Sequence, residues 1–345
     1  RFFLWEMGWR TLQQSFWRAG RLGVVRTDHL GDMVLTLPLL AALRRLRPEA
    51  ECLIFAHPRT APLLNGQTGI TAVFLRNAEE CRRAFRTWQP EILFFPRPVF
   101  EEVWAAKRAG IPYRIGSGYR WYSLLFTHRI YEHRRTAERH EAEYNVGMLA
   151  RAAGIAELPV ELVPPQISET VREKVHQVVR QHGVEATAFV VLHPGGRGSA
   201  PRWRPESFAL LAERLEGEGI PCLLTGSAEE LELAERIRCR FPQARLLFGE
   251  LTTEEFIALL ARARVVVANS TGALHIAAAL GVPVVGLYSL VPAHHPRRWG
   301  PYSKRATVLT PPPGMPPDAV WAIPPETVYN AVRFWWEHSV CETPR

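Results

Sequence analysis

The sequence predicts an α/β protein made of two doubly wound domains of similar size. Its 345 residues are enough for two domains, and hydrophobic residues, 47% of the total, are numerous enough for two cores. In both halves, short apolar runs alternate with segments of helical periodicity, which is typical of a parallel sheet covered by helices. We expect the two domains to face each other across a cleft.

The first half contains four expected strands separated by segments of helical period. The strands are expected at residues 22–25, 51–55, 72–75 and 92–95. Helices are expected at residues 37–46, 78–88 and 141–153. The stretch from Tyr113 to Arg139 is basic and rich in aromatic residues, and we expect it to be irregular or partly helical.

The second half repeats this organisation after a proline-rich stretch, residues 158–166, which we interpret as a linker. Apolar runs predict strands at residues 189–192, 221–225, 245–248, 265–268 and 284–288. Helices are expected between them at residues 205–217, 229–239, 253–263 and 274–280. A last helix is expected at residues 325–338.

These elements divide the chain into four expected regions. Residues 1–20 form an N-terminal aromatic and basic helical extension, and residues 21–160 form an N-terminal Rossmann-like domain. Residues 166–318 form a C-terminal Rossmann-like domain. Residues 319–345 contain a C-terminal helix that we expect to pack back on the N-terminal domain.

The N-terminal extension is crowded with aromatic and apolar residues, with Arg10 and Arg18 among them. Tryptophan and arginine on a short amphipathic helix suit a membrane interface. The alternative is a helix that packs on the protein's own core, and the absence of one clean apolar stripe favours it. The sequence contains no apolar run long enough to cross a bilayer and no recognisable signal peptide.

The charge balance favours an acidic partner. The net charge is +8 and the isoelectric point is about 9.6, and arginine is suited to phosphate and carboxylate groups by its planar fork. Nucleic acid, phosphorylated lipid and nucleotide-sugar all fit, and so does a basic solvated surface. The five cysteines are scattered without a CxxC pair, which argues against disulfides and structural zinc and indicates a reducing compartment.

One loop of the first half places a carboxylate directly after an expected strand. Residues 26–32 read RTDHLGD and lie between the strand at residues 22–25 and a helix that begins near Met33. Ligands of open α/β sheets bind at the carboxyl ends of strands, where Asp32 can act as a general base. The alternative is that Asp32 caps the helix, because Asp is a favoured capping residue.

Two loops of the second half carry glycine and charge at strand ends. Residues 193–204 read HPGGRGSAPRWR, and their glycine N–H groups and arginines suit a phosphate. A flexible surface loop is the alternative. Residues 225–230 read TGSAEE, and their carboxylates either stabilise the start of the next helix or hold a ribose hydroxyl.

A third loop, residues 268–275, reads ANSTGALH and leads from a β-branched strand into a helix. The free N–H groups of the helix start would meet a pyrophosphate there, with His275 directed at the same anion. A half-buried structural histidine is the alternative. A nucleotide-sugar transferase needs such a site and a base in the other domain, whereas a nucleotide-binding regulator needs only the second-half site. Asp32 favours the enzyme, and the lack of a GxGxxG after the first strand argues against a dehydrogenase.

Together these motifs resemble glycosyltransferase family 9, the ADP-heptose:lipopolysaccharide heptosyltransferases. The resemblance covers roughly residues 22–310. It rests on RTDHLGDMVLTLP at residues 26–38, HPGG at 193–196, NSTGALHIAAALGVPVVGLY at 269–288 and RRWGPY at 297–302.

The resemblance implies a GT-B fold and an inverting enzyme that moves a heptose from ADP-heptose to the lipopolysaccharide inner core or a related surface glycan. It implies an acceptor site in the N-terminal domain and a donor site in the C-terminal domain. The nucleotide-sugar is then a substrate, and we expect neither a tightly bound cofactor nor a bound metal. Another nucleotide-sugar donor, or a non-catalytic nucleotide-sugar-binding protein, is the alternative.

The resemblance also implies roles for individual residues. Asp32 matches the catalytic base. The positions that match donor-binding residues are the phosphate-loop residues Gly195 and Gly196, the ribose-binding Glu230, the adenine-packing Leu251, and the pyrophosphate-binding Thr271, Gly272 and His275.

Two positions depart from the family pattern. Pro201 stands where the family often has a lysine, and Arg202 or Arg204 would supply the missing charge. Ser270 stands where the family usually has an aspartate, and we keep it as a donor-binding candidate.

The acceptor is expected to be an acidic glycolipid, such as the lipopolysaccharide core or a lipid A–Kdo-like molecule, and nucleic acid is not expected to bind. We expect the protein at the cytoplasmic face of the inner membrane, with peripheral membrane contact. Acceptor contacts are expected from Arg26, His29, Gly31, Arg59, Arg114 and Arg120. The basic stretch that contains Arg114 and Arg120 continues through Arg129, Arg134, Arg135 and Arg139 and is either a docking surface or a solvated loop.

Overall fold

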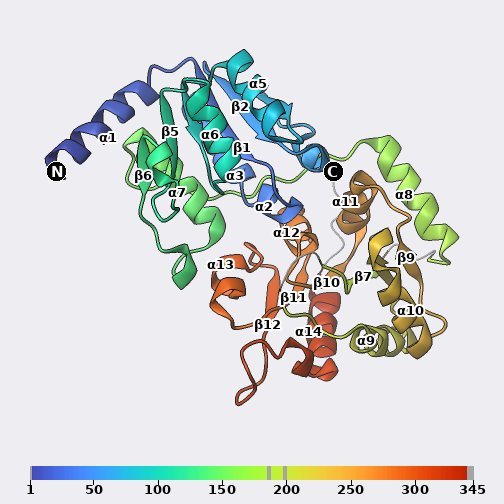
Figure 1. Ribbon diagram of the computed structural model, residues 1–345. Coiled ribbons are helices and arrows are strands. Elements are labelled where there is room, and N and C mark those ends of the chain that lie inside the picture. The colour runs from blue at the N-terminus through green and yellow to red at the C-terminus, as the bar shows by residue number, and fades with distance from the viewer. Residues whose placement is uncertain (1, 185–187, 197–199, 340–345) are drawn as a thin grey trace. The chain divides into compact units, whose positions relative to one another are not determined.

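The computed structural model describes residues 2–184, 188–196 and 200–339 and has the predicted α/β fold (Figure 1). It contains two parallel six-stranded sheets. The chain forms two compact units, residues 1–134 with 138–163 and residues 135–137 with 164–345. The chain therefore leaves the first unit within the proline-rich stretch that the sequence marks as a linker.

The first sheet has the strand order β3-β2-β1-β4-β5-β6, with all neighbours parallel. Val24 of β1 lies opposite Ile54 of β2 on one side and Phe94 of β4 on the other. The strand order reverses between β1 and β4, and such a switch point is where doubly wound sheets bind ligands. The strands are β1 (Arg21–Arg26), β2 (Glu51–Ala56), β3 (Ile70–Phe74), β4 (Ile92–Phe94), β5 (Tyr113–Ser117) and β6 (His128–Ile130).

The helices of the first unit bury their apolar faces against this sheet. One core cluster joins Phe55 and Leu93 of the strands to Phe85 of α5 and Val103 of α6. The α-helices are α1 (Phe2–Phe16), α2 (Leu30–Val34), α3 (Leu37–Leu46), α4 (Ala61–Leu64), α5 (Ala78–Trp88), α6 (Phe100–Arg108) and α7 (Glu141–Ala153). Short 3₁₀ turns are η1 (Pro58–Thr60), η2 (Ser123–Leu125) and η3 (Arg134–Thr136).

The expectation that Tyr113–Arg139 is irregular or partly helical is wrong for two of its segments. Strands β5 and β6 lie there, paired in parallel as the last two strands of the sheet. Both are short, and Arg114 and Arg129 interrupt their apolar residues. A charged residue every few positions hides the period-2 pattern on which strand prediction relies.

The N-terminal helix packs on the first unit rather than standing free. Leu12 and Phe16 of α1 are fully buried and Trp9 is 6% exposed. The indole of Trp17 donates to the Ala153 carbonyl at 3.0 Å, and Arg151 lies over the Trp9 ring. From residue 7 onward the core-packing alternative therefore describes α1. Among the described residues, no helix is both long and apolar enough to cross a membrane.

The second sheet has the strand order β12-β11-β10-β7-β8-β9, again entirely parallel. Renumbered from β7, this order is the same as that of the first sheet, and its switch point lies between β7 and β10. The strands are β7 (Val190–His193), β8 (Cys222–Gly226), β9 (Leu246–Phe248), β10 (Val265–Asn269), β11 (Val284–Leu287) and β12 (Ala306–Leu309). Their near-continuous burial is typical of parallel strands covered on both faces.

The C-terminal helix contributes to the core of the second unit. Val328, Tyr329 and Val332 of α14 belong to that core cluster, and the Trp335 indole donates to Thr307 of β12 at 2.9 Å. Part of its apolar face is therefore buried within its own unit. The α-helices of this unit are α8 (Glu169–Gln181), α9 (Pro205–Gly217), α10 (Leu231–Arg240), α11 (Thr253–Arg262), α12 (Gly272–Ala279), α13 (Pro296–Trp299) and α14 (Pro325–His338). Its 3₁₀ turns are η4 (Ala228–Glu230), η5 (Pro292–His294) and η6 (Val320–Ala322).

Candidate active site

Asp32 lies just beyond the carboxyl end of β1, at the switch point of the first sheet. The helix that the sequence predicts from Met33 to Leu46 is broken into α2 and α3, and Asp32 is the third residue of α2. The N-cap of α2 is His29, and the Asp32 carboxylate turns to Arg26 instead of to the helix N–H groups. The capping alternative is therefore wrong.

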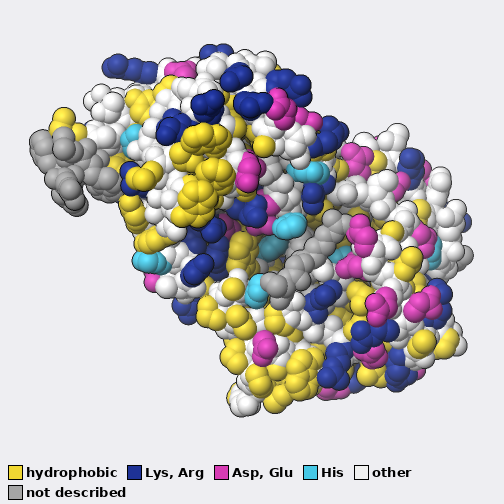
Figure 2. All heavy atoms as spheres, viewed as in Figure 1, with side chains coloured by type: hydrophobic (Ala, Val, Ile, Leu, Met, Phe, Trp, Pro, Cys, Tyr) yellow, Lys and Arg dark blue, Asp and Glu magenta, His cyan; other side chains and the backbone are white. Residues whose placement is uncertain are grey.

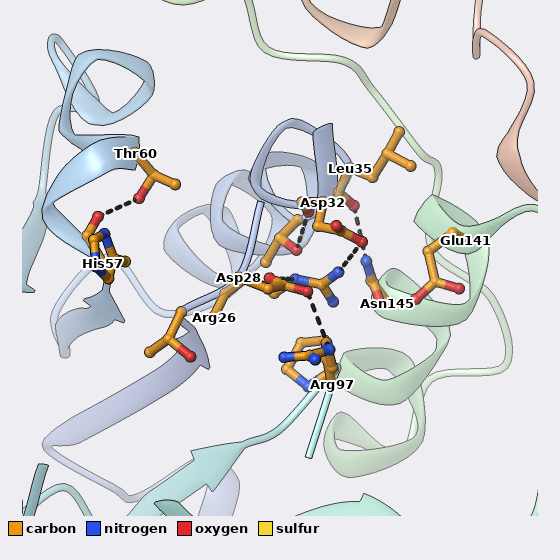
Figure 3. Close-up of polar contacts among 12 residues, drawn as sticks. Arg26, Asp28, Asp32, Leu35, His57, Thr60, Arg97, Glu141 and Asn145 are labelled. Atoms are coloured by element: carbon orange, nitrogen blue, oxygen red, sulfur yellow. Dashed lines mark hydrogen bonds and ion pairs between the residues drawn. The ribbon is translucent and has the colours of Figure 1, made fainter. Parts of the chain in front are cut away.

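Arg26, the last residue of β1, stands between two carboxylates (Figure 3). Its Nη2 donates to Asp32 Oδ1, and its Nε lies 2.7 Å from Asp28 Oδ1. Arg97 approaches the other oxygen of Asp28 at 3.5 Å. Asp32 Oδ2 has no hydrogen-bond partner among the described residues, so one oxygen of this carboxylate is held and the other is available.

The three groups differ in exposure, and this decides which one can react. The side chains of Arg26 and Asp28 are 1% and 4% exposed, whereas that of Asp32 is 17% exposed. Burial raises the pKa of Asp32 above its ordinary value, while the charge of Arg26 opposes that rise. Burial pulls the pKa of Arg26 down, but the charges of Asp28 and Asp32 outweigh it and the pKa is raised. Arg26 is thus a fixed cation, and Asp32 is a partly accessible carboxylate with enhanced basicity.

Helix α7 supports this arrangement from a distant part of the sequence. Asn145, fully buried, donates to the Leu35 carbonyl at 3.0 Å, which fixes the turn after α2. Glu141 is 2% exposed and accepts from Arg134 at 2.6 Å. Its charge raises the pKa of both Arg26 and Asp32. Figure 3 shows both α7 side chains beside the Arg26–Asp32 pair.

A second buried carboxyl group adjoins the loop. Glu102 of α6 is 6% exposed and accepts a hydrogen bond from the Thr27 hydroxyl. Burial raises its pKa to about 7, and the Asp28 charge adds to that rise. Neither Glu102 nor Glu141 is near residue 26 in sequence, so no local pattern reveals them. Asp28 does carry a local signal, because RxDxxxD places two acids around one arginine.

The expected acceptor-binding residues separate into two groups. Arg26 is buried and paired with both neighbouring acids. Arg114 is half-buried and donates to the carbonyls of Leu125 and Ile111. An acceptor contact at either residue stays a prediction. The other candidates are His29 and Arg120, both exposed, Gly31, buried within α2, and Arg59, exposed and hydrogen-bonded to His57.

Two arginines of the basic stretch have partners within the protein. Arg134 donates to Glu141 at 2.6 Å and to the Pro96 carbonyl at 3.2 Å, so its charge is used inside the first unit. Arg139 lies 3.9 Å from Glu132.

In the second unit, the glycine loop after β7 meets Glu230. The Gly196 N–H donates to Glu230 Oε1 at 2.8 Å, and a Cβ added to Gly195 would lie 2.5 Å from the same carboxylate. The other oxygen of Glu230 accepts from the Ser227 N–H at 2.9 Å and belongs to a capping box. Burial would raise the pKa of Glu230, but these hydrogen bonds outweigh it and the pKa is lowered. Residues 197–199 of this loop lie outside the described residues.

The loop after β10 lies against the same glycines. A Cβ added to Gly196 would be 2.8 Å from the Thr271 methyl group. Thr271 is the N-cap residue of α12, and its hydroxyl is buried without a hydrogen-bond partner among the described residues. Gly272 begins α12, and His275, 6% exposed, follows in its first turn. The structure therefore brings Gly195, Gly196, Glu230 and Thr271 to one end of the second sheet.

Asn269 connects these two loops by hydrogen bonds and was not among the site residues predicted from the sequence. It is 1% exposed, accepts from the Trp203 N–H at 2.8 Å and donates to the Pro194 carbonyl at 2.8 Å. A buried side-chain amide can satisfy one donor and one acceptor at the same time. The sequence did contain a signal for this residue, because an asparagine stands at the end of the expected strand, directly before the STG motif.

The two candidate arginines have different surroundings. Arg202 Nη1 donates to the Gly196 carbonyl at 3.2 Å, so its charge is at the glycine loop. The Arg204 guanidinium lies 5.0 Å from the centre of the Trp321 ring instead. Of the two arginines, Arg202 is the one that contacts the glycine loop. Leu251, half-buried, follows β9, and Ser270 contacts the Tyr288 hydroxyl.

Among the described residues, no group of three or more His, Cys, Asp or Glu side chains is arranged to hold a metal ion. The described cysteines, Cys52, Cys81, Cys222 and Cys239, are free thiols.

Comparisons with known proteins place this geometry in context. The chain matches glycosyltransferase family 9 (heptosyltransferase) over residues 102–317. Lipopolysaccharide heptosyltransferase 2 of Escherichia coli is 27% identical over 286 residues, which cover 77% of this chain and 81% of the relative.

Solved structures share the fold. Glycosyltransferase family 9 from Veillonella parvula superposes with a TM-score of 0.82 at 20% identity, over 93% of this chain and 98% of that chain. The Escherichia coli ADP-heptose lipopolysaccharide heptosyltransferase II superposes with a TM-score of 0.76 at 24% identity, over 92% of this chain and 98% of that chain. Such likeness extends to both sheets and supports the GT-B type of fold.

Proposed function

This chain belongs to glycosyltransferase family 9, and from that membership we propose that it transfers a heptose from ADP-heptose to the lipopolysaccharide inner core or a related surface glycan. The names of its relatives support this donor and this acceptor. The anomeric carbon is inverted in the reaction. The nucleotide-sugar is consumed as a substrate, and no tightly bound cofactor takes part.

One observation carries the proposal. Asp32 presents a single free carboxylate oxygen at the switch point of the first sheet, while Arg26 holds the other oxygen. A general base needs an accessible oxygen in a fixed direction and a pKa suited to accepting a proton. Burial raises the pKa of Asp32 toward that range.

In the proposed reaction, Asp32 Oδ2 accepts the proton of the acceptor hydroxyl. The acceptor oxygen forms a bond to the anomeric carbon from the face opposite the diphosphate, and the bond from that carbon to the diphosphate oxygen breaks. The electron pair leaves with ADP. A diphosphate needs little protonation to leave, so one carboxylate is sufficient.

The donor site is proposed at the carboxyl end of the second sheet. Gly195, Gly196, Thr271, Gly272 and His275 would surround the diphosphate, because helix starts and glycine loops present N–H groups to anions. The unpartnered Thr271 hydroxyl supports this placement. Arg202 would stabilise the negative charge that develops on the leaving phosphate.

The remaining donor contacts are proposed around the nucleoside and sugar. Glu230 would hold the ribose, and Leu251 would pack on adenine. The Gly196 N–H donates to Glu230 in this structure. On donor binding, the same N–H would donate to a phosphate oxygen instead. Ser270 lies next to Thr271 and is assigned to the same donor.

An acidic, lipid-linked acceptor is proposed for the first unit, with His29, Gly31, Arg59 and Arg120 as its candidate contacts. Such an acceptor is anchored in a bilayer, so we propose that the enzyme works at the cytoplasmic face of the inner membrane.

The decisive experiment separates donor binding from turnover. Asp32→Asn should abolish turnover and leave the thermal stabilisation by ADP unchanged, because the variant loses the base but keeps the donor site. Turnover that survives the substitution would remove Asp32 from the chemistry. Loss of both turnover and ADP binding would mean that Asp32 acts structurally.

A thermal-shift panel of ADP-heptose, UDP-sugars and GDP-sugars tests the donor. ADP-heptose is expected to stabilise the protein most. Stronger stabilisation by another nucleotide-sugar would identify that nucleotide-sugar as the donor. ADP binding without turnover on any acceptor would indicate a non-catalytic binding protein.

A further inference from the structure

The first unit exposes a cluster of large apolar side chains that the proposed reaction does not use. Trp121 is 80% exposed, Leu124 is 75% exposed and Trp104 is 43% exposed. Trp104 belongs to α6, while Trp121 and Leu124 belong to the segment around η2. Where Figure 1 shows α6, Figure 2 shows hydrophobic side chains bordered by those of Lys and Arg.

These side chains form one connected surface. The half-buried Phe100 ring stacks on Trp121, with centroids 4.9 Å apart, and on Trp104, with centroids 6.2 Å apart. Three aromatic rings from two elements therefore lie in contact. The exposed Leu124 lies three residues after Trp121, in the η2 turn that contacts α6.

The surface has a rigid base. The neighbours of its exposed residues, Tyr122 and Leu125, are 9% and 8% exposed and belong to the core cluster of the first unit. The Tyr122 hydroxyl donates to the Pro98 carbonyl at 2.8 Å, and Arg114 Nε donates to the Leu125 carbonyl at 2.8 Å. Trp121 and Leu124 are thus each followed directly by a buried residue that is fixed in place.

Positive charge borders the apolar surface. Lys107 Nζ and Arg108 Cζ lie 5.9 Å and 6.0 Å from the centre of the Trp104 ring. Arg120 precedes Trp121 and is exposed. Within the described part of the chain, none of these three cations has an ion pair with a carboxylate. Glu101 is the exposed acid on the same helix, so the cations outnumber it.

We propose that this surface docks on an anionic lipid bilayer. It consists of Phe100, Trp104, Lys107, Arg108, Arg120, Trp121 and Leu124, and we call it the α6–η2 surface. Tryptophan rings favour the headgroup level of a bilayer, a leucine beside them enters the acyl boundary, and lysine and arginine are attracted to anionic headgroups. A rigid aromatic base with unpaired cations fits that chemistry.

The sequence offered membrane contact of the N-terminal extension only as the less favoured alternative, and the α6–η2 surface is a different part of the first unit. This assignment deepens the proposed function, because an enzyme that docks on a bilayer meets a lipid-linked acceptor there. Docking itself rests on the surface alone. Vesicles that contain neither donor nor acceptor therefore test it separately from the reaction.

The experiment measures co-sedimentation of the full chain with vesicles. One set contains phosphatidylcholine alone, and the other contains phosphatidylcholine with phosphatidylglycerol. The protein should bind the anionic vesicles, and added salt should weaken that binding because exposed charges are screened. Failure to bind anionic vesicles at low salt would overturn the proposal.

Two double variants locate the binding surface. Lys107→Gln with Arg108→Gln should weaken binding to anionic vesicles by more than about tenfold, since each cation near an anionic surface contributes severalfold. Trp121→Ser with Leu124→Ser should weaken it comparably, because both apolar side chains insert. All four side chains are exposed, so the melting temperature serves as a check that the variants fold.

Matched controls come from the second unit. Lys174→Gln with Arg180→Gln removes one exposed lysine and one exposed arginine from α8, and Leu231→Ser with Phe334→Ser removes two exposed apolar side chains. Both controls should bind like the unsubstituted protein. If the surface variants and the controls lose vesicle binding equally, that binding depends only on net charge or overall hydrophobicity. This result would overturn the assignment of the α6–η2 surface.

A final comparison distinguishes lipid from glycan. The α6–η2 variants should retain turnover on a delipidated, water-soluble acceptor and lose it on the same acceptor embedded in vesicles. If they bind vesicles normally but lose turnover on the soluble acceptor, the aromatic rings recognise the glycan and the lipid proposal is wrong. If the unsubstituted protein binds vesicles but transfers no sugar, the docking surface stands and the proposed function fails.

Discussion

At the scale of single residues, Arg26 sets the charge balance of the loop that carries Asp32. It is buried beside Asp28 and Asp32, and one cation there compensates two acids. Removing a partner from a buried pair leaves an uncompensated charge, which is strongly unfavourable. The arrangement leaves Asp32 partly exposed and Asp28 buried, so two acids four residues apart differ in their access to a substrate.

The Glu102 carboxyl group should make stability depend on pH. Its pKa is raised from 4.5 to about 7 in the folded protein. Between these pH values the unfolded chain loses the proton while the folded protein keeps it, so stability falls as the pH rises. Glu102→Gln removes this loss and should raise the free energy of unfolding above pH 7 by about 3 kcal/mol.

Chemical denaturation at several pH values checks this expectation. The advantage of Glu102→Gln should shrink as the pH falls and vanish below about pH 4, where both states are protonated. Glu101→Gln is the matched control, because Glu101 is adjacent in sequence but exposed. An advantage that does not change with pH would contradict a raised pKa.

Arg202 and Arg204 provide a second residue-level prediction. Arg202 contacts the glycine loop, whereas Arg204 lies over Trp321. Arg202→Gln should weaken ADP binding by about 10- to 100-fold, the usual range for a charge-assisted contact to phosphate. Arg204→Gln should leave ADP affinity nearly unchanged. Calorimetric titration measures both, and the reverse order would assign the phosphate to Arg204.

At the scale of elements, the donor site depends on how two loops are joined. Asn269 ends β10 and ties the backbone of Trp203 to that of Pro194. Both backbone groups belong to the loop after β7, so the buried side chain of Asn269 fixes that loop from the neighbouring strand β10. The indole of Trp203 is itself buried and donates to the Ile323 carbonyl at 2.8 Å.

Asn269→Ala should lower the free energy of unfolding by about 2–4 kcal/mol, because it leaves a buried donor and a buried acceptor without partners. ADP binding should weaken as well, since the glycine loop loses its attachment. Ser168→Ala removes only the N-cap of α8 and should cost about 1 kcal/mol without affecting ADP. Thermal melts with and without ADP distinguish the two, and an unaltered ADP affinity in Asn269→Ala would show that the loop is fixed by other contacts.

Most elements were predictable because their hydrophobic period is strong. Residues 78–88 form α5 with the predicted bounds, and α3 ends at Leu46 as predicted. The failures occur where the period is weak or interrupted. β5 and β6 are short and carry charge, β12 is only partly buried, and α2 ends after five residues at a turn that Asn145 stabilises from α7.

At the scale of the whole molecule, the two units repeat one strand order and place their candidate residues at corresponding switch points. Asp32 follows β1, and Gly195 follows β7, the first strand of each sheet. A right-handed crossover between parallel strands permits few arrangements, so the same topology recurs. The C-terminal helix α14 completes the core of the second unit.

Val328→Ala tests this role of α14. Val328 is fully buried, and the substitution should lower the free energy of unfolding by about 2 kcal/mol through lost packing and a residual cavity. Hydrogen exchange should increase in α9 and β10 and stay unchanged in the first sheet. Val308→Ala is the control, because Val308 is 38% exposed. Faster exchange in the first sheet would support the expectation that the C-terminal helix packs on the N-terminal domain.

The sequence by itself determined the fold class, the repeated α/β organisation and the loops that carry the candidate chemistry, because these depend on local periodicity and on glycine and charge next to apolar runs. Tertiary structure alone decided which charges remain available. Arg26 and Arg114 have hydrogen-bond or ion-pair partners within the first unit. Glu102 and Glu141 act on the Asp32 loop from helices distant in sequence. Arg202 rather than Arg204 lies at the glycine loop. The physical reason is that burial and ion pairing depend on neighbours in space, and these neighbours are far apart along the chain.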